Sequence, residues 1–200
     1  METFLKIYLP VYLLLYIVIS FLLPTYRTWK RTGINPITFG KSDNAHDYIG
    51  FVMKLLIAFL FVSVLLFAIG KNWYQYIVPI TYLEKSALRI LGFVLIHTSL
   101  VWISIAQYQM SNSWRIGIDE VNKTELKTKE LFSISRNPIF LGVILSVLGV
   151  FCIIPNALTF FVALSTYYII QIQIRLEEEF LEKRHGNNYH IYKLKAKRFI

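Results

Sequence analysis

Apolar residues form five long stretches along this chain, separated by short polar segments. About 20 consecutive apolar residues are needed to cross the hydrocarbon core of a bilayer as a helix. The first three stretches cover roughly residues 3–24, 49–69 and 87–108, and the last two cover residues 139–154 and 157–174. The pattern predicts an all-α polytopic membrane protein with about five transmembrane helices.

Only two residues, Pro155 and Asn156, separate the last two stretches. Such a dipeptide is a turn signal, and two helices joined by a short turn pack antiparallel. We therefore expect a C-terminal helical hairpin, followed by a cytoplasmic helical segment. Because each arm is slightly short for a full crossing, a partly inserted hairpin stays open as an alternative.

Most of the 21 Lys and Arg residues lie in three polar segments. These segments lie between the first and second stretches, between the third and fourth, and after the fifth. Segments on the cytoplasmic side of membrane proteins are enriched in Lys and Arg. Five spans place all three segments on one side, so we predict an integral membrane protein with its N-terminus outside and its C-terminus cytoplasmic.

The composition agrees with a membrane protein and excludes several other classes. Of 200 residues, 56% are hydrophobic and 16% charged, against roughly 25% charged in soluble domains. The net charge of +9 lies in blocks between apolar stretches, which argues against a nucleic-acid partner. One cysteine, Cys152, excludes an internal disulfide. No metal-binding spacing of His or Cys is present, so we expect no metal site.

The chemistry-bearing motifs lie after residue 110. We divide the chain into N-terminal transmembrane helices (1–110) and a cofactor-binding catalytic region (111–200) that holds a connector, the hairpin and the tail. Arg136-Asn137-Pro138 opens the fourth stretch, with Asn137 suited to cap the helix and Pro138 to its first turn. A Glu-rich segment follows the fifth stretch.

On a helix, Arg175, Glu178, Glu179 and Glu182 fall on one face at i, i+3, i+4 and i+7. Taken alone, this face is typical of a solvated helix with surface ion pairs, and the Arg-Asn-Pro motif of a simple helix start. The turn of the hairpin changes the interpretation, because it brings both motifs to the same membrane face. Two polar motifs that meet at the lipid boundary predict a functional site.

From about Trp114 to the C-terminus, the chain resembles the isoprenylcysteine carboxyl methyltransferase / phospholipid methyltransferase superfamily of membrane enzymes. Their signature is Arg-His-Pro-x-Tyr at a helix start, a helical hairpin, a Glu-Glu cluster, Gly-x-x-Tyr-x-x-Tyr and a basic end. The corresponding residues here are Arg136-Asn137-Pro138-Ile139-Phe140, Glu177-Glu178-Glu179, Gly186-Asn187-Asn188-Tyr189-His190-Ile191-Tyr192 and Arg198-Phe199-Ile200. The first hundred residues match only as generic spans.

The resemblance implies that S-adenosyl-L-methionine binds between the ends of the last membrane helices and the C-terminal segment. Carried over by motif, the residues expected to contact this cofactor are Thr124, Glu125, Leu126, Lys127, Phe132, Arg136, Asn137, Pro138, Phe140, Glu178, Glu179 and Tyr189. The register of the Glu cluster also leaves Glu177 open. Arg175 matches an arginine on the substrate side, and we assign it as the catalytic residue, able to hold a carboxylate by two hydrogen bonds.

Two positions depart from the signature, because Asn137 replaces its His and Phe140 its Tyr. Asn still forms hydrogen bonds and Phe still packs, so we expect cofactor binding to be retained, while the departures leave the acceptor open. The resemblance implies methyl transfer to a small lipophilic substrate that enters from the bilayer, with the carboxylate of a prenylcysteine-like or isoprenoid compound as the leading choice.

The open alternatives are a phospholipid N-methyltransferase, a steroid-reductase-like membrane enzyme with a nicotinamide cofactor, and a non-catalytic scaffold. Membrane lipids are expected neighbours, and the oligomeric state stays open.

Overall fold

The structure is a computed structural model that describes residues 2–39, 44–119, 122 and 125–200. About 80% of the residues are helical, and the described part contains isolated bridges but no β-strand. Four helices are long and apolar enough to cross a membrane, and a fifth, Pro138–Ile153, is shorter. The predicted all-α membrane fold is confirmed.

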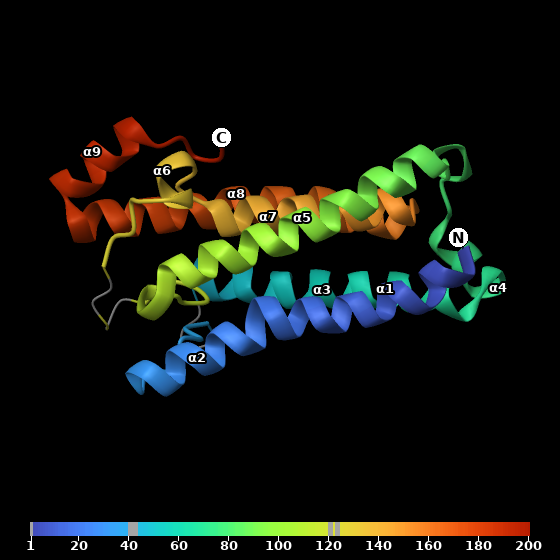
Figure 1. The fold of residues 1–200 in the computed structure, drawn as a ribbon, viewed down its shortest axis with the longest axis horizontal. Coiled ribbons are helices and arrows are strands. Elements are labelled where there is room, and N and C mark those ends of the chain that lie inside the picture. The colour runs from blue at the N-terminus through green and yellow to red at the C-terminus, as the bar shows by residue number, and fades with distance from the viewer. Residues whose placement is uncertain (1, 40–43, 120–121, 123–124) are drawn as a thin grey trace.

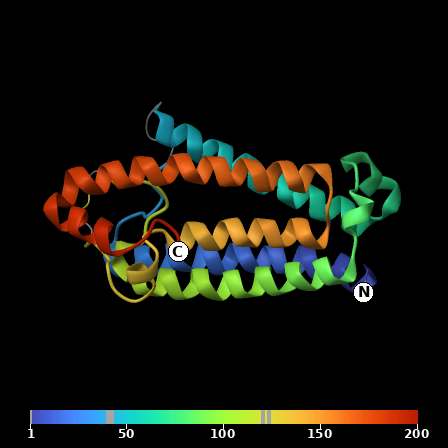
Figure 2. The same ribbon diagram turned by 90° about the horizontal axis from the view of Figure 1, so that it is seen from above.

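The long helices lie side by side in a bundle (Figures 1 and 2). In chain order the elements are α1 (Glu2–Ile17), the π-helical turn η1 (Val18–Leu22), α2 (Leu23–Thr32), α3 (Ala45–Ile69), α4 (Lys71–Tyr74), α5 (Ser86–Met110), α6 (Leu131–Ile134), α7 (Pro138–Ile153), α8 (Ala157–His185) and α9 (Asn187–Lys195). Single 3₁₀ turns follow α4 and α5, and another precedes α5.

The predicted spans and the observed helices differ mainly in length. The first helix runs continuously over Glu2–Thr32, beyond the predicted end at residue 24, so Arg27, Lys30 and Arg31 lie on a helix and not in a loop. Likewise α8 continues through the Glu-rich segment to His185. The polar residues at these ends continue the helix, because extending a helix that an apolar stretch has already formed costs far less than nucleating a new one.

The hairpin of α7 and α8 is confirmed, and its turn is held by hydrogen bonds. Asn156 is fully buried and caps α8, accepting from the Thr159 amide at 2.9 Å. Its side-chain amide donates to the Ser63 hydroxyl at 3.1 Å, which ties the turn to α3. The turn is therefore a structural junction of three helices.

The arms of the hairpin pack mainly on other helices. Contacts between α5 and α7 depend on glycines, since a Cβ on Gly149 would lie 2.6 Å from Ile96 and one on Gly142 2.4 Å from Ile103. The other arm, α8, packs on α3. The two arms therefore belong to different sides of the bundle, which leaves room between them near their open end.

Three cationic segments gather at one end of the bundle, as the sequence predicted. Figure 1 shows α2, α6 and α9 at this end, which we call the basic end, whereas α4 and the N-terminus lie at the other. Which end faces the cytoplasm stays a prediction. The division at residue 110 also stays a prediction, although α5 before it packs tightly on α7 after it.

Candidate functional site

A cavity of about 400 Å³ lies at the basic end, between the open arms of the hairpin. This volume falls in the roughly 300–1,000 Å³ range of small-molecule sites. Helices α3, α5, α7 and α8 and the turn η1 supply its walls, and residues 113–119 and 125–127 and helix α9 also line it. It therefore lies where the two polar motifs were expected to meet.

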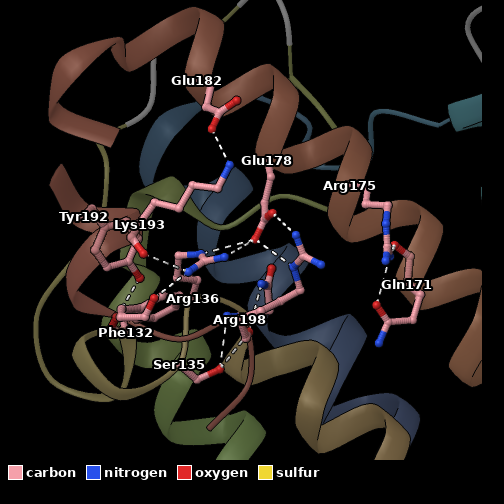
Figure 3. Close-up of polar contacts among 12 residues, drawn as sticks. Phe132, Ser135, Arg136, Gln171, Arg175, Glu178, Glu182, Tyr192, Lys193 and Arg198 are labelled. Atoms are coloured by element: carbon pink, nitrogen blue, oxygen red, sulfur yellow. Dashed lines mark hydrogen bonds and ion pairs between the residues drawn. The ribbon is translucent and has the colours of Figure 1, made fainter. Parts of the chain in front are cut away.

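The two motifs meet in a buried ion cluster (Figure 3). Arg136 donates from Nη2 to Glu178 Oε1 at 2.8 Å, and Arg198 donates from Nη2 to Glu178 Oε2 at 2.7 Å. The side chains of Arg136 and Glu178 are 8% and 6% exposed. One carboxylate thus joins the start of α7, the end of α8 and the C-terminal tail (residues 196–200).

The C-terminal tail lies against the start of α7. The Arg136 amide donates to the Lys197 carbonyl at 2.8 Å, and the Asn137 side-chain amide donates to the Arg198 carbonyl at 3.1 Å. Asn137 occupies the N-cap position, but its side chain makes no capping bond to α7. The capping expectation is therefore wrong in its chemistry, because the tail takes the Asn137 amide, whereas Pro138 does lie in the first turn.

Aromatic residues of α9 fill the space beneath the tail. Tyr189 and Tyr192 are buried, and the Tyr192 hydroxyl donates to the Phe132 carbonyl at 2.6 Å. Burial raises the pKa of Tyr189 to about 12, so its hydroxyl stays neutral. A hydrogen bond from Arg198 to Glu178 raises the pKa of Arg198. The tail is therefore held in place by both apolar and charged contacts.

A second carboxylate, Glu177, faces the cavity with different partners. Gln173 donates from Nε2 to Glu177 Oε1 at 2.7 Å. The Gln173 carbonyl in turn lies 3.3 Å from His46 Nδ1, and His46 Nε2 accepts from the Ile118 amide at 2.9 Å. Because Nε2 accepts, Nδ1 carries the proton and donates to Gln173. This chain of hydrogen bonds fixes the Gln173 amide so that it donates to Glu177.

The described residues that follow α5 in the connector, 114–119, are held by contacts with residues 34–39, which follow α2. The Ile116 amide donates to the Pro36 carbonyl at 2.9 Å. Gly117 has φ +97° and lies so close to His46 that a Cβ would be 2.6 Å from Nε2. A side chain at Gly117 would therefore displace the histidine.

Next to Gly117, Asp119 pairs with Arg115 at 2.9 Å, and both side chains are 7% exposed. Burial opposes ionisation of Asp119, but hydrogen bonds from Asn122 and Arg115 outweigh it and hold the pKa of Asp119 below its ordinary value. The Asp119–Arg115 ion pair and the hydrogen bond from Ile116 to Pro36 together hold residues 115–119 in place.

Most residues expected to bind the cofactor line the cavity. These residues are Glu125, Leu126, Lys127, Phe132, Arg136, Asn137, Pro138, Phe140, Glu178 and Tyr189. Thr124 lies outside the described residues. Glu125 and Lys127 pair with each other at 2.9 Å at the exposed rim.

Two expected residues, Arg175 and Glu179, point away from the cavity. Arg175 is exposed and donates to the carbonyl and the side chain of Gln171, one turn earlier (Figure 3). Glu179 is exposed and pairs with Lys183 at 2.6 Å. The expectation of a common functional face for Arg175, Glu178 and Glu179 is therefore wrong.

The reason is the orientation of α8. Its inward face is set by Ile170, Gln173, Glu177 and Leu181, which line the cavity at helical spacing. At 100° per residue, Arg175 and Glu179 fall on the side of α8 opposite to this inward face. Of the three glutamates in the cluster, Glu177 and Glu178 line the cavity and Glu179 does not, while their role toward the cofactor stays a prediction.

The sequence interpretation missed several residues in the cavity wall. Gln173 carried no motif, and Ser20 and Gln107 lie in stretches interpreted only as generic spans. Lys54 did carry a signal, since ionisable residues within spans are often functional, but its place near the end of a predicted span favoured a side chain that snorkels to the interface.

Comparison with known proteins agrees with the geometry. A family model described as phospholipid methyltransferase matches residues 86–188. This match extends from the start of α5 into α9 and includes the hairpin, Arg136 and both inward carboxylates. No curated protein matches the chain significantly. Because the family match covers just over half of the chain, this protein belongs to the phospholipid methyltransferase family of membrane methyltransferases, within the superfamily that the motifs indicated.

Proposed function

We propose that this protein transfers a methyl group from S-adenosyl-L-methionine to a lipophilic carboxylate acceptor in the basic-end cavity. The observation that carries the proposal is the convergence of Arg136, Glu177 and Glu178 on one cavity of a membrane methyltransferase. A nicotinamide-dependent reductase is disfavoured by the family membership.

The residues present fit the cofactor chemically. Its ammonium and ribose hydroxyls need acceptors, and its adenine needs flat apolar contacts. Both oxygens of Glu178 are bound by arginines, whereas Glu177 receives one donor, Gln173, among the described residues. We therefore assign the cofactor's ammonium or ribose hydroxyls to Glu177, whose carboxyl oxygens keep acceptor positions beyond the one bond from Gln173.

Aromatic walls provide the second requirement. Phe132, Phe140 and Tyr189 line the cavity near the ion cluster. Such rings pack on adenine and attract a sulfonium by about 0.5–2 kcal/mol per contact. Arg136 and Glu178 then act as positioning residues, which hold the C-terminal tail over the site and exclude water.

The chemistry asks little of the protein beyond orientation. S-Adenosylmethionine supplies an electrophilic methyl group; the acceptor oxygen bonds to it as the carbon–sulfur electron pair stays on sulfur. A carboxylate acceptor loses no proton in this step, so no general base is required. Holding the reactants in line and away from water contributes roughly 7–11 kcal/mol to such reactions.

The proposal is tested by incubating the purified protein with S-adenosylmethionine labelled in its methyl group and a membrane lipid extract. We expect label in the lipid fraction, released as volatile methanol by mild alkali because the product is an ester. Heat-inactivated protein is the control.

Each other outcome has a defined meaning. If the label survives alkali and is found in an amine-containing lipid, the acceptor is a phospholipid amine and not a carboxylate. Absence of transfer, together with absence of cofactor binding, would refute the enzyme proposal and favour the scaffold.

A further inference from the structure

The cavity has a second polar end, inside the membrane portion of the bundle. Ser20 lies in the π-helical turn η1 and lines the cavity wall. Its side chain is buried, at 2% exposure, and its hydroxyl has no hydrogen-bond partner among the described residues. A buried polar group without a partner costs about 1–3 kcal/mol, so such a group calls for an explanation.

The local helix geometry adds to this observation. A π turn inserts an extra residue into a helix and shifts its hydrogen-bond pattern, and such turns occur frequently at functional sites. Here the carbonyl of Ser20 accepts from the Gln107 side chain at 2.6 Å, which joins η1 to α5. Gln107 also lines the cavity. The Ser20 carbonyl is therefore satisfied from α5, whereas its hydroxyl, which lies near the Tyr16 hydroxyl but makes no well-formed hydrogen bond among the described residues, is left to bind a ligand.

The neighbouring helix α3 places a cation on the same cavity. Lys54 lies nine residues after Ala45, the first residue of α3, or about 14 Å along the helix. It lines the cavity and is exposed, which puts it at an opening of the wall. No ion pair is found for Lys54 in the described part of the chain. A charge at this depth of a membrane helix is costly, and such residues are mostly found where they pair with another group or bind a ligand.

We propose that Lys54 and Ser20 bind the polar head of the acceptor, and that Lys54 makes the enzyme selective for an anionic head. The inference rests on the proposed function and deepens it. Lys54 pairs with the carboxylate of the acceptor, and the Ser20 hydroxyl donates to its head group. This subsite takes the role that the sequence gave to Arg175, which faces away from the cavity.

The surroundings suit an amphiphile with an apolar tail. Met53, Ile57 and Val143 belong both to the cavity and to an adjoining apolar pocket of about 50 Å³ between α1, α3, α7 and α8. The apolar tail of the acceptor therefore extends from the head group into the bundle interior and from there toward the bilayer. Methylation removes the negative charge of the head, so the product ester loses its ion pair with Lys54 and its release is favoured.

The test is equilibrium binding without cofactor, with two probes that share one tail. The probes are N-acetyl-S-farnesylcysteine, a lipophilic carboxylate, and its neutral carboxamide, both titrated in detergent micelles. We expect the wild type to bind the carboxylate at least tenfold more tightly than the amide. Lys54→Gln should remove this preference, Lys54→Arg should retain it, and Ser20→Ala should weaken both probes about threefold.

Lys6→Gln is the matched control, because Lys6 also lies in a membrane helix but pairs with Glu2 at the opposite end. Binding of S-adenosylhomocysteine to Lys54→Gln shows that this variant is folded, and we expect its Kd within twofold of the wild type. A carboxylate preference that is absent from the wild type, or that persists in Lys54→Gln, would overturn the inference. If the preference depends on Lys54 but the wild type binds no S-adenosylhomocysteine, the proposed function fails and the anion subsite stands.

Discussion

The two ends of the α7–α8 hairpin are both polar and buried, yet they are organised differently. At the turn, Asn156 and Thr159 form a reciprocal cap, and Asn156 also binds Ser63. At the open end, Arg136 and Glu178 pair beside a cavity of about 400 Å³. At the turn, the polar side chains are hydrogen-bonded to neighbouring chain segments. At the open end, they border a cavity large enough for a ligand.

This difference separates structural from functional polarity in one hairpin. A polar group inside a membrane bundle is retained either because it is fully bonded or because a ligand completes it. Asn156 belongs to the first kind. In our proposals Glu177 in the hairpin and Ser20 in η1 belong to the second, and Glu178 lies between them. Substitutions at the turn should therefore change stability alone, and those at the open end should change binding.

Glu178→Gln should have the largest effect, because it acts on both properties. Two arginines would lose their anionic partner, and removing one member of a buried pair costs about 3–5 kcal/mol. We expect release of the C-terminal tail, seen as rapid trypsin cleavage there, and at least a 100-fold loss of cofactor affinity. Glu179→Gln, one residue along and exposed, is the control and should behave as wild type. Equal effects of the two substitutions would contradict the inward face assigned to α8.

Asn156→Ala should lower stability and leave binding intact. Loss of the helix cap costs about 0.5–2 kcal/mol, and the Ser63 hydroxyl loses one partner. The expected result is a Tm several degrees below that of the wild type, with the Kd for S-adenosylhomocysteine unchanged in the folded protein. A change in Kd would remove the distinction between the two ends.

Gln173→Leu should sharpen the comparison within the open end. The substitution removes the donor to Glu177 and the link to His46, but it keeps the volume and the helix propensity. We expect about a five- to tenfold loss of cofactor affinity with trypsin resistance of the tail retained. An unchanged affinity would show that Glu177 needs no positioning.

The smallest effect is expected from acid. The pKa of Asp119 is lower in the folded chain than its ordinary value near 3.8, so its pairing stabilises the connector above that value. The stabilisation falls as pH drops through the folded-state pKa, because the protonated acid no longer pairs with Arg115. Hydrogen exchange of the connector should therefore accelerate below about pH 4 relative to the rest of the chain. In Asp119→Asn this exchange should be fast already at pH 6, with little further change in acid.

Much of the architecture was predictable from the sequence because it depends on local signals. Five apolar stretches, the turn at Pro155 and Asn156, and the clustering of cations predicted the helices, the hairpin and the basic end. The meeting of Arg136 with Glu178 was predictable as well, because the hairpin connects them. These inferences need only helix periodicity and chain connectivity.

The remaining features depend on packing that no local pattern records. Which side of α8 faces inward is set by its contacts with α3, so Arg175 and Glu179 were misplaced. The π turn at Ser20 has no sequence marker, and the capture of Asn137 by the tail requires the tail's final position. Motif spacing located the site but did not give the orientation of its members.

The most direct test of the central claim is calorimetric titration of the purified protein with S-adenosylhomocysteine. Our account predicts saturable binding of one molecule per chain by the wild type, and at least tenfold weaker binding by Glu177→Gln at an unchanged Tm. The matched variant Glu182→Gln, at a pair with Lys193 outside the cavity, should bind as wild type. No heat at 1 mM ligand, or equal affinity in Glu177→Gln and the wild type, would contradict the claim that this cavity holds the methyl donor.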